Sequence, residues 1–226
     1  CNFTTILKDK TMKKLVKLFQ NAFSARQTAK WGEGGSPKNR LLRLESLESR
    51  QLLAATSLVA EATQAALVAA INEVDAGGTV YFAEELAGQT ITLTGSQIAL
   101  SKNVTIDGGD LGITIDANRE SRVFYIDANV EVVINGLTLT GGYSEIATHN
   151  SGNGGAIFNR YATLSVINTT ITDNESRDGA AIFNCHGELY VVDSTIVENE
   201  ATRFGGAVYN FGKTATISIA NSVLTG

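Results

Sequence analysis

Hydrophobic residues recur along most of the chain in short runs that alternate with polar positions, the pattern of half-buried β-strands. Examples are TVYF at 79–82 and TITLT at 90–94. Gly, Asn or Asp separates successive runs, and apolar runs of ten or more residues at helical spacing are absent from this part. The pattern therefore predicts an all-β body that begins near residue 79.

Within this body the same blocks of sequence recur at a fixed interval. GGAIFN at 154–159, GAAIFN at 179–184 and GGAVYN at 205–210 start 25 and 26 residues apart. A second block, VINTTITDN at 166–174, returns after 25 residues as VVDSTIVEN at 191–199. Looser copies of the second block are VTIDGG at 104–109, VINGLTLTGG at 133–142 and IANSVL at 219–224.

Three short β-rich runs in each period of about 25 residues predict one coil of a triangular solenoid. We therefore expect residues 79–226 to form a right-handed parallel β-helix of three-stranded coils, about six in number. Gly and Asn between the runs fit corners that need positive φ. Because the chain stops inside a coil, at SVLTG, we expect it to be part of a longer protein.

Stacked coils place equivalent residues in columns along the axis. The repeat predicts an aliphatic column of Ile157, Ile182 and Val208, a neighbouring aromatic column of Phe158, Phe183 and Tyr209, and a third column of Ile171 and Ile196. It also predicts asparagine ladders at two corners, in which amides bond to amides from coil to coil. The ladder residues are Asn159, Asn184 and Asn210 at one corner, and Asn174 and Asn199 at another.

Residues 56–78 differ from the body and predict an N-terminal cap. The stretch 57–74 is rich in alanine, and Leu67, Ala70, Ile71 and Val74 form an apolar stripe at helical spacing. Glycine in DAGG ends this helix. An amphipathic helix here would cover the first rung, whose edge is otherwise unpaired.

Residues 1–55 differ from the rest of the chain in charge and are predicted to be a leader. This leader is expected to be either helical or disordered. The first 54 residues hold 11 Lys or Arg and four Asp or Glu, whereas the remainder holds seven and 19. The acidic body argues against nucleic-acid binding. The only methionine, Met12, opens MKKLVKLFQNAF, so residues 1–11 are expected to lie upstream of the translated start.

The end of this leader, LRLESLESRQLLAA at 42–55, resembles the LEPR-x-LL leader of large planctomycete-type extracellular proteins. Leu47, Glu48, Arg50, Leu52 and Leu53 match that pattern, and Ser49 stands where the family commonly has proline. The resemblance implies export, with cleavage near Ala54 or Ala55. The same stretch also reads as an ordinary amphipathic helical linker.

The GGAIFN and GGAVYN blocks resemble the GGA[ILV] repeats of polymorphic outer membrane proteins, within the pectin-lyase-like β-helix superfamily. Ile171-x-x-Asn174 and Ile196-x-x-Asn199 stand in place of the partner motif F-x-x-N. This likeness implies a surface or secreted protein, in some relatives an adhesin.

Many proteins of this fold are polysaccharide lyases or glycoside hydrolases, so a carbohydrate-active enzyme is the alternative function. Such an enzyme needs acidic residues around one cleft. The candidates that could cluster across adjacent coils are Asp173, Arg177, Asp178, His186 and Asp193. CHG at 185–187 is similar to the GHG of polygalacturonases, but the other motifs of that family do not appear. DGGD at 107–110 would suit a Ca²⁺ ion.

Other chemistry finds little support. Two histidines, His149 and His186, and the lone body cysteine, Cys185, give no zinc spacing, and no phosphate loop or dinucleotide fingerprint occurs. The sequence thus predicts an exported, non-catalytic β-helix at the cell surface or outside the cell, without a cofactor. It would serve as an adhesive or structural stalk that contacts surface glycans or other surface proteins. The longest insertion between coils, at 141–155, is where a ligand would be expected.

Overall fold

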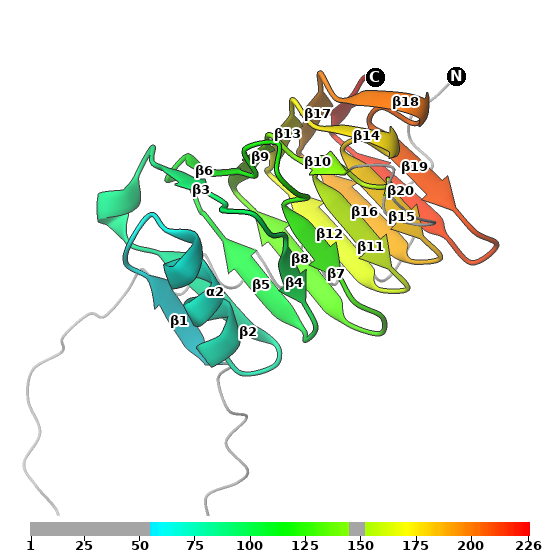
Figure 1. Ribbon diagram of the computed structural model, residues 1–226. Helices are drawn as coiled ribbons and strands as arrows, with labels where there is room; N and C mark the ends of the chain where they lie inside the picture. The colour runs from blue at the N-terminus through cyan, green and yellow to red at the C-terminus, as the bar shows by residue number, and fades with distance from the viewer. Residues whose placement is uncertain (1–54, 145–151) are drawn as a thin grey trace, which may run out of the picture. The chain divides into compact units, whose positions relative to one another are not determined.

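The computed structural model describes residues 55–144 and 152–226, which form one stack of short parallel strands (Figure 1). The chain climbs through about six turns with a period near 26 residues, and each turn adds a strand to each of several sheets. The predicted parallel β-helix is therefore confirmed. No helix in these two ranges is long and apolar enough to cross a membrane. The leader motif lies outside the described residues.

Three sheets run along the stack. Sheet A contains β1 (Thr56–Val59), β2 (Gly78–Phe82), β5 (Val104–Asp107), β8 (Glu131–Asn135), β12 (Thr163–Ile167), β16 (Glu188–Val192) and β20 (Thr216–Ala220). Sheet B contains β3 (Thr90–Thr92), β6 (Ile113–Asp116), β9 (Leu137–Thr140), β13 (Thr170–Thr172), β17 (Thr195–Val197) and β21 (Val223–Leu224). Sheet C contains β4 (Ile98–Leu100), β7 (Phe124–Ile126), β11 (Ile157–Arg160), β15 (Ile182–Cys185) and β19 (Val208–Phe211).

A fourth sheet, sheet D, corrects the prediction of three-stranded coils. It contains β10 (Tyr143–Ser144), β14 (Glu175–Asp178) and β18 (Glu200–Phe204), inserted between sheets B and C in three coils. Its strands carry few apolar residues, such as ESRD in β14, so they lack the alternation that marked the other runs. They form because coil stacking satisfies their backbone, as in the bond from the Glu175 N–H to the Gly142 carbonyl (2.8 Å).

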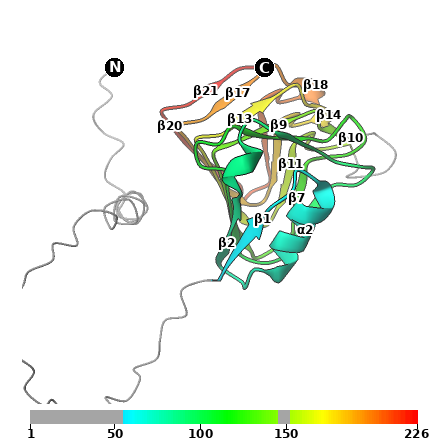
Figure 2. The same ribbon diagram turned by 90° about the vertical axis from the view of Figure 1, so that its left-hand side faces the viewer.

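The cap differs from the prediction at its start. Thr56–Val59 is not helical but forms β1, which pairs in parallel with β2. The helix α2 runs from Gln64 to Glu73. It begins at Gln64 because the Thr63 hydroxyl caps its N-terminus by accepting from the Ala66 N–H. The predicted stripe is confirmed, since Leu67, Ala70 and Ile71 are buried. Figure 2 views the stack from this end, with α2 and β1 in front of the coils.

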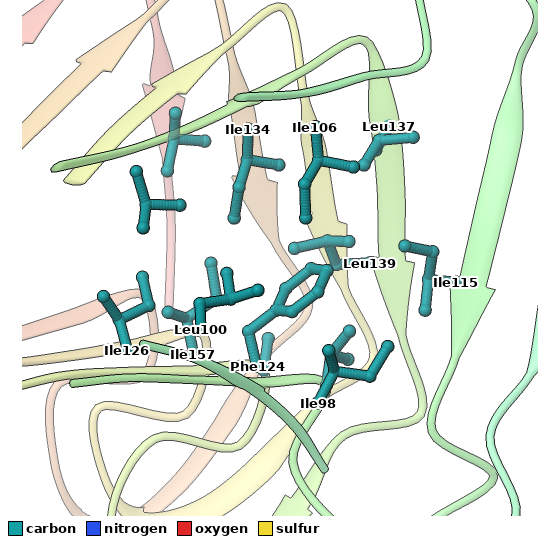
Figure 3. Packing of buried hydrophobic residues seen from close by; sticks show 14 of the residues in the cluster. Ile98, Leu100, Ile106, Ile115, Phe124, Ile126, Ile134, Leu137, Leu139 and Ile157 are labelled. Atoms are coloured by element: carbon teal, nitrogen blue, oxygen red, sulfur yellow. The ribbon is translucent and has the colours of Figure 1, made fainter. Parts of the chain in front are cut away.

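The interior is a set of apolar columns, one residue from each coil (Figure 3). Ile157 pairs with Ile182 and Ile182 with Val208, and Ile171 pairs with Ile196, as the repeat predicted. The early coils continue the columns, with Phe124 beside Ile157 and Leu139 beside Ile171. Their packing supplies most of the hydrophobic stabilisation of the stack.

Both predicted asparagine ladders are present. Asn159 donates its amide to the Asn184 oxygen (2.7 Å), and Asn184 donates to Asn210 (2.6 Å). At the other corner, Asn174 donates to the Asn199 oxygen at 2.8 Å. Each ladder amide also donates to a backbone carbonyl near its own turn, so the ladders hold turn and stack together.

Candidate functional site

The predicted catalytic residues do not gather at one place. Asp173 follows β13, Asp193 lies in the turn between β16 and β17, and His186 lies in the turn between β15 and β16. These three turns are separate corners of the coil. The structure brings only Arg177 and Asp178 together, as neighbours in β14. The structure thus places the predicted cluster on several corners of the coil, because residues stack on one another only when they lie about one full period apart.

Asp178 is the best-organised polar group of this set. Its carboxylate is 1% exposed and accepts two bonds from Arg203, at 2.8 and 2.5 Å, and one from Arg177 at 3.2 Å. Burial raises the pKa of Asp178, but the hydrogen bonds from Arg203 and Arg177 outweigh burial and leave this pKa lowered. A carboxylate held as an anion by two guanidinium groups braces two coils and is a poor general acid.

Asp173 is also engaged. Its carboxylate lies 2.5 Å from the Arg119 guanidinium, which reaches Glu175 as well at 3.3 Å. Both partners of the first pair are at least half exposed, so the bridge is a solvated surface interaction.

An aromatic column lines the outside of sheet C. Tyr125 stacks on Phe158, Phe158 on Phe183, and Phe183 packs against Tyr209, with ring centres 5.2 to 5.5 Å apart. Phe158 and Phe183 are only 6% and 4% exposed, although they lie outside the apolar interior. The predicted column is thus present, but its two central rings offer no open face to a ligand.

Arg122 covers part of that column. Its guanidinium carbon lies 5.5 Å from the centre of the Phe158 ring, and its Nε donates to the Asn153 carbonyl at 2.7 Å. Burial lowers the pKa of Arg122 to about 10, with a smaller opposing effect from Tyr125, so the side chain stays cationic at neutral pH. This arginine ties the insertion after β10 to sheet C. Of the predicted ligand-binding insertion 141–155, residues 145–151 lie outside the described residues.

Two aromatic rings stack at the corner between sheets C and A, and the sequence analysis does not predict this stacking. Tyr161 follows β11 and His186 follows β15, and their rings stack with centres 4.8 Å apart and planes 1° apart. Both residues have positive φ, 51° and 58°. The signal was available in the repeat, where YA after Asn159-Arg160 and HG after Asn184-Cys185 occupy the same turn position.

Two further predicted groups, Cys185 and the DGGD segment, lie elsewhere on the coils. Burial raises the pKa of the Cys185 thiol, which favours its protonated form. Asp107 of the DGGD segment accepts from the Gly109 N–H at 2.9 Å and from the Asn135 amide at 2.7 Å. No group of three or more His, Cys, Asp or Glu side chains suited to a metal ion occurs in residues 55–144 and 152–226.

The predicted polar residues form bracing contacts within and between the coils. The predicted acids either belong to ion pairs or lie at different corners. Comparison of the chain with models of protein families, with curated proteins and with solved structures gave no match. Function therefore rests on the sequence motifs and on the chemistry of the coils themselves.

Proposed function

We propose that this chain is an exported, non-catalytic β-helix at the cell surface or outside the cell, acting as an adhesive or structural stalk module. The observation that carries the proposal is that the polar side chains of the later coils bond to one another from coil to coil. The asparagines form ladders, and Asp178 is neutralised by Arg203 of the next coil. Glycosidases and lyases need a free acid or base that faces the substrate. The predicted candidates lie at different corners or in ion pairs, so they do not form such a group together.

Export is supported by the leader motif that ends near Ala55 and by the acidic body that follows it. A stack of coils also suits a stalk, because each coil contacts only its neighbours and length can be added without changing the cross-section. Glycans or other surface proteins are the proposed partners.

The test is incubation of the full chain with a panel of neutral and acidic polysaccharides, with and without Ca²⁺. Unsaturated products at 235 nm and new reducing ends report cleavage, and retardation in native gels containing each polysaccharide reports binding. We expect no cleavage and retardation by at least one glycan. Cleavage would overturn the proposal in favour of a carbohydrate-active enzyme. Absence of both cleavage and retardation would overturn the adhesive role and leave the structural stalk.

A further inference from the structure

We propose that Tyr161 and Asn129, at the corner between sheets C and A, form a binding position for one sugar ring of a neutral glycan. This inference rests on the adhesive role proposed above and gives it a location and a ligand class. The position lies beside the exposed face of Tyr161, on the side away from His186.

The first argument is the backbone conformation of the corner. Tyr161, His186 and Gly212 follow paired strands and occupy the equivalent position in three successive coils, with φ of 51°, 58° and 107°. At the same corner of the preceding coil, Asn129 has φ of 64° and its N–H donates to the Tyr161 carbonyl. Asn and Gly tolerate this left-handed region, whereas a bulky aromatic residue is an outlier there. Backbone strain of this kind is found at ligand-binding positions. Tyr161 is thus held where Asn or Gly would be easier to accommodate.

The second argument is the arrangement of the rings. His186 stacks on one face of Tyr161, and the His186 ring itself lies over Gly212, where any Cβ would collide with it. On the side of the preceding coil the neighbour is Asn129, whose N–H donates to the Tyr161 carbonyl, and His186 is the only ring that packs on Tyr161 among residues 55–144 and 152–226. Tyr161 is accordingly 50% exposed. One face of the tyrosine is fixed by the histidine, and the other is available for stacking.

The third argument is the polar group beside the open face. Asn129 is exposed, and its side-chain amide makes no hydrogen bond among the described residues, while its N–H donates to the Tyr161 carbonyl at 3.0 Å. An amide supplies both a donor and an acceptor. A flat apolar face next to such a group matches a pyranose ring, which has an apolar C–H face and hydroxyl groups around its edge.

Charge favours a neutral sugar over an acidic one. The nearest ion pair joins Arg160 to Asp127 at 3.1 Å, so each charge is already compensated. The chain as a whole carries a formal charge of −5, which disfavours anionic glycans at a site without a spare cation.

The experiment compares full-length wild type with Tyr161→Asn in native gels containing neutral or acidic polysaccharides. Tyr161→Asn places at this turn the residue already used at Asn129, so we expect thermal stability equal to or above wild type. We also expect at least a tenfold weaker retardation by the neutral glycan that retards wild type. Tyr81→Thr, which removes a 42% exposed tyrosine from the outside of β2, is the matched control and should bind as wild type does.

The outcomes separate the site from the function. Equal retardation of wild type and Tyr161→Asn would overturn this site while leaving an adhesive role in place. No retardation of wild type by any glycan would overturn both. Retardation by acidic glycans alone would contradict the assigned ligand class. Loss of binding in Tyr161→Asn together with a lower melting temperature would overturn the claim that Tyr161 is strained, and Asn129→Ala would then test the position through the amide alone.

Discussion

The coils before Ser144 and those from Ser144 onward have the same architecture but are held together differently. In the described residues, every buried polar side chain belongs to the later part: Ser144, Asn153, Asn159, Ser165, Thr169, Asn174, Ser176, Asp178, Asn184, Ser194 and Asn199. The early coils bury only apolar side chains, such as Ile106 and Phe124. The later coils add hydrogen bonds that run from coil to coil inside the turns.

The boundary between the two kinds of coil is visible in one column. Asn159 aligns with Ile126 of the preceding coil, so the ladder begins where an amide replaces an isoleucine. The Asn159 oxygen is buried and has no hydrogen-bond partner, since Ile126 offers no donor. The comparison teaches that polar ladders demand a particular residue at each step, whereas apolar columns accept any side chain of suitable volume.

The largest effect is expected from Asn184→Leu, in the middle of the ladder. This change removes the acceptor of Asn159 and the donor to Asn210, and it leaves the carbonyls of Gly187 and Thr216 without that amide. We expect the free energy of unfolding to fall by about 3 kcal/mol. Urea unfolding followed by circular dichroism measures it. A loss below about 1 kcal/mol would show that the ladder is not what stabilises the later coils.

A smaller loss, about 2 kcal/mol, is expected from Asp178→Asn, because Arg203 and Arg177 lose a charged acceptor. The half-exposed Arg203 regains water, which limits the loss. The matched control is Asp173→Asn, whose surface pair with Arg119 should contribute less than about 0.5 kcal/mol. Equal effects of the two substitutions in thermal unfolding would contradict the distinction.

Acid should weaken the later coils before the early ones. Since the folded pKa of Asp178 is lowered, its contribution is present above the ordinary value of 3.8 and is lost as the pH falls from there through the folded pKa. Hydrogen exchange at pH 5 and at successively lower pH should show β14 and β18 losing protection before β5 and β6. Asp178→Asn should remove this difference, and simultaneous loss along the whole stack in wild type would argue against it.

A smaller effect than that of either the ladder or the buried-charge substitution is expected from Ile126→Val, at the early-coil position that aligns with the ladder. The fully buried isoleucine loses one methylene group, which costs about 1 kcal/mol. The same urea titration used for Asn184→Leu gives the comparison. A loss as large as that of the asparagine substitution would mean that the two kinds of column tolerate change equally.

This contrast explains what the sequence could predict. The ladders of Asn159 and Asn174 were visible because the residue type itself repeats. The early coils were visible only as loose copies, because Val104 and Ile106 need only be apolar. Sheet D is not predicted because its short strands have no hydrophobic period, and the sequence of β1 predicts helix because it adjoins an alanine-rich segment.

The functional surface was harder to predict than the fold. The sequence predicts His186 as a catalytic candidate, whereas in the structure its ring stacks on that of Tyr161. Which turn position has positive φ becomes evident only when the coils are aligned in space. The grouping of the acidic residues fails for a related reason. Residues that lie several positions apart in one coil reach different corners, whereas residues about one period apart stack on one another.

The spacing between two of the later coils also defines a unit of length that could be removed or repeated. Ile157 and Ile182 are equivalent and 25 residues apart, as are Asn159 and Asn184. Deleting residues 157–181 would join Ala156 to Ile182 and put Asn184 next to Ile126, with every remaining column in phase. Duplicating the same segment would lengthen the protein by one strand spacing, about 4.8 Å. Such a chain can serve as a ruler whose reach is adjusted in whole coils while its cross-section stays constant.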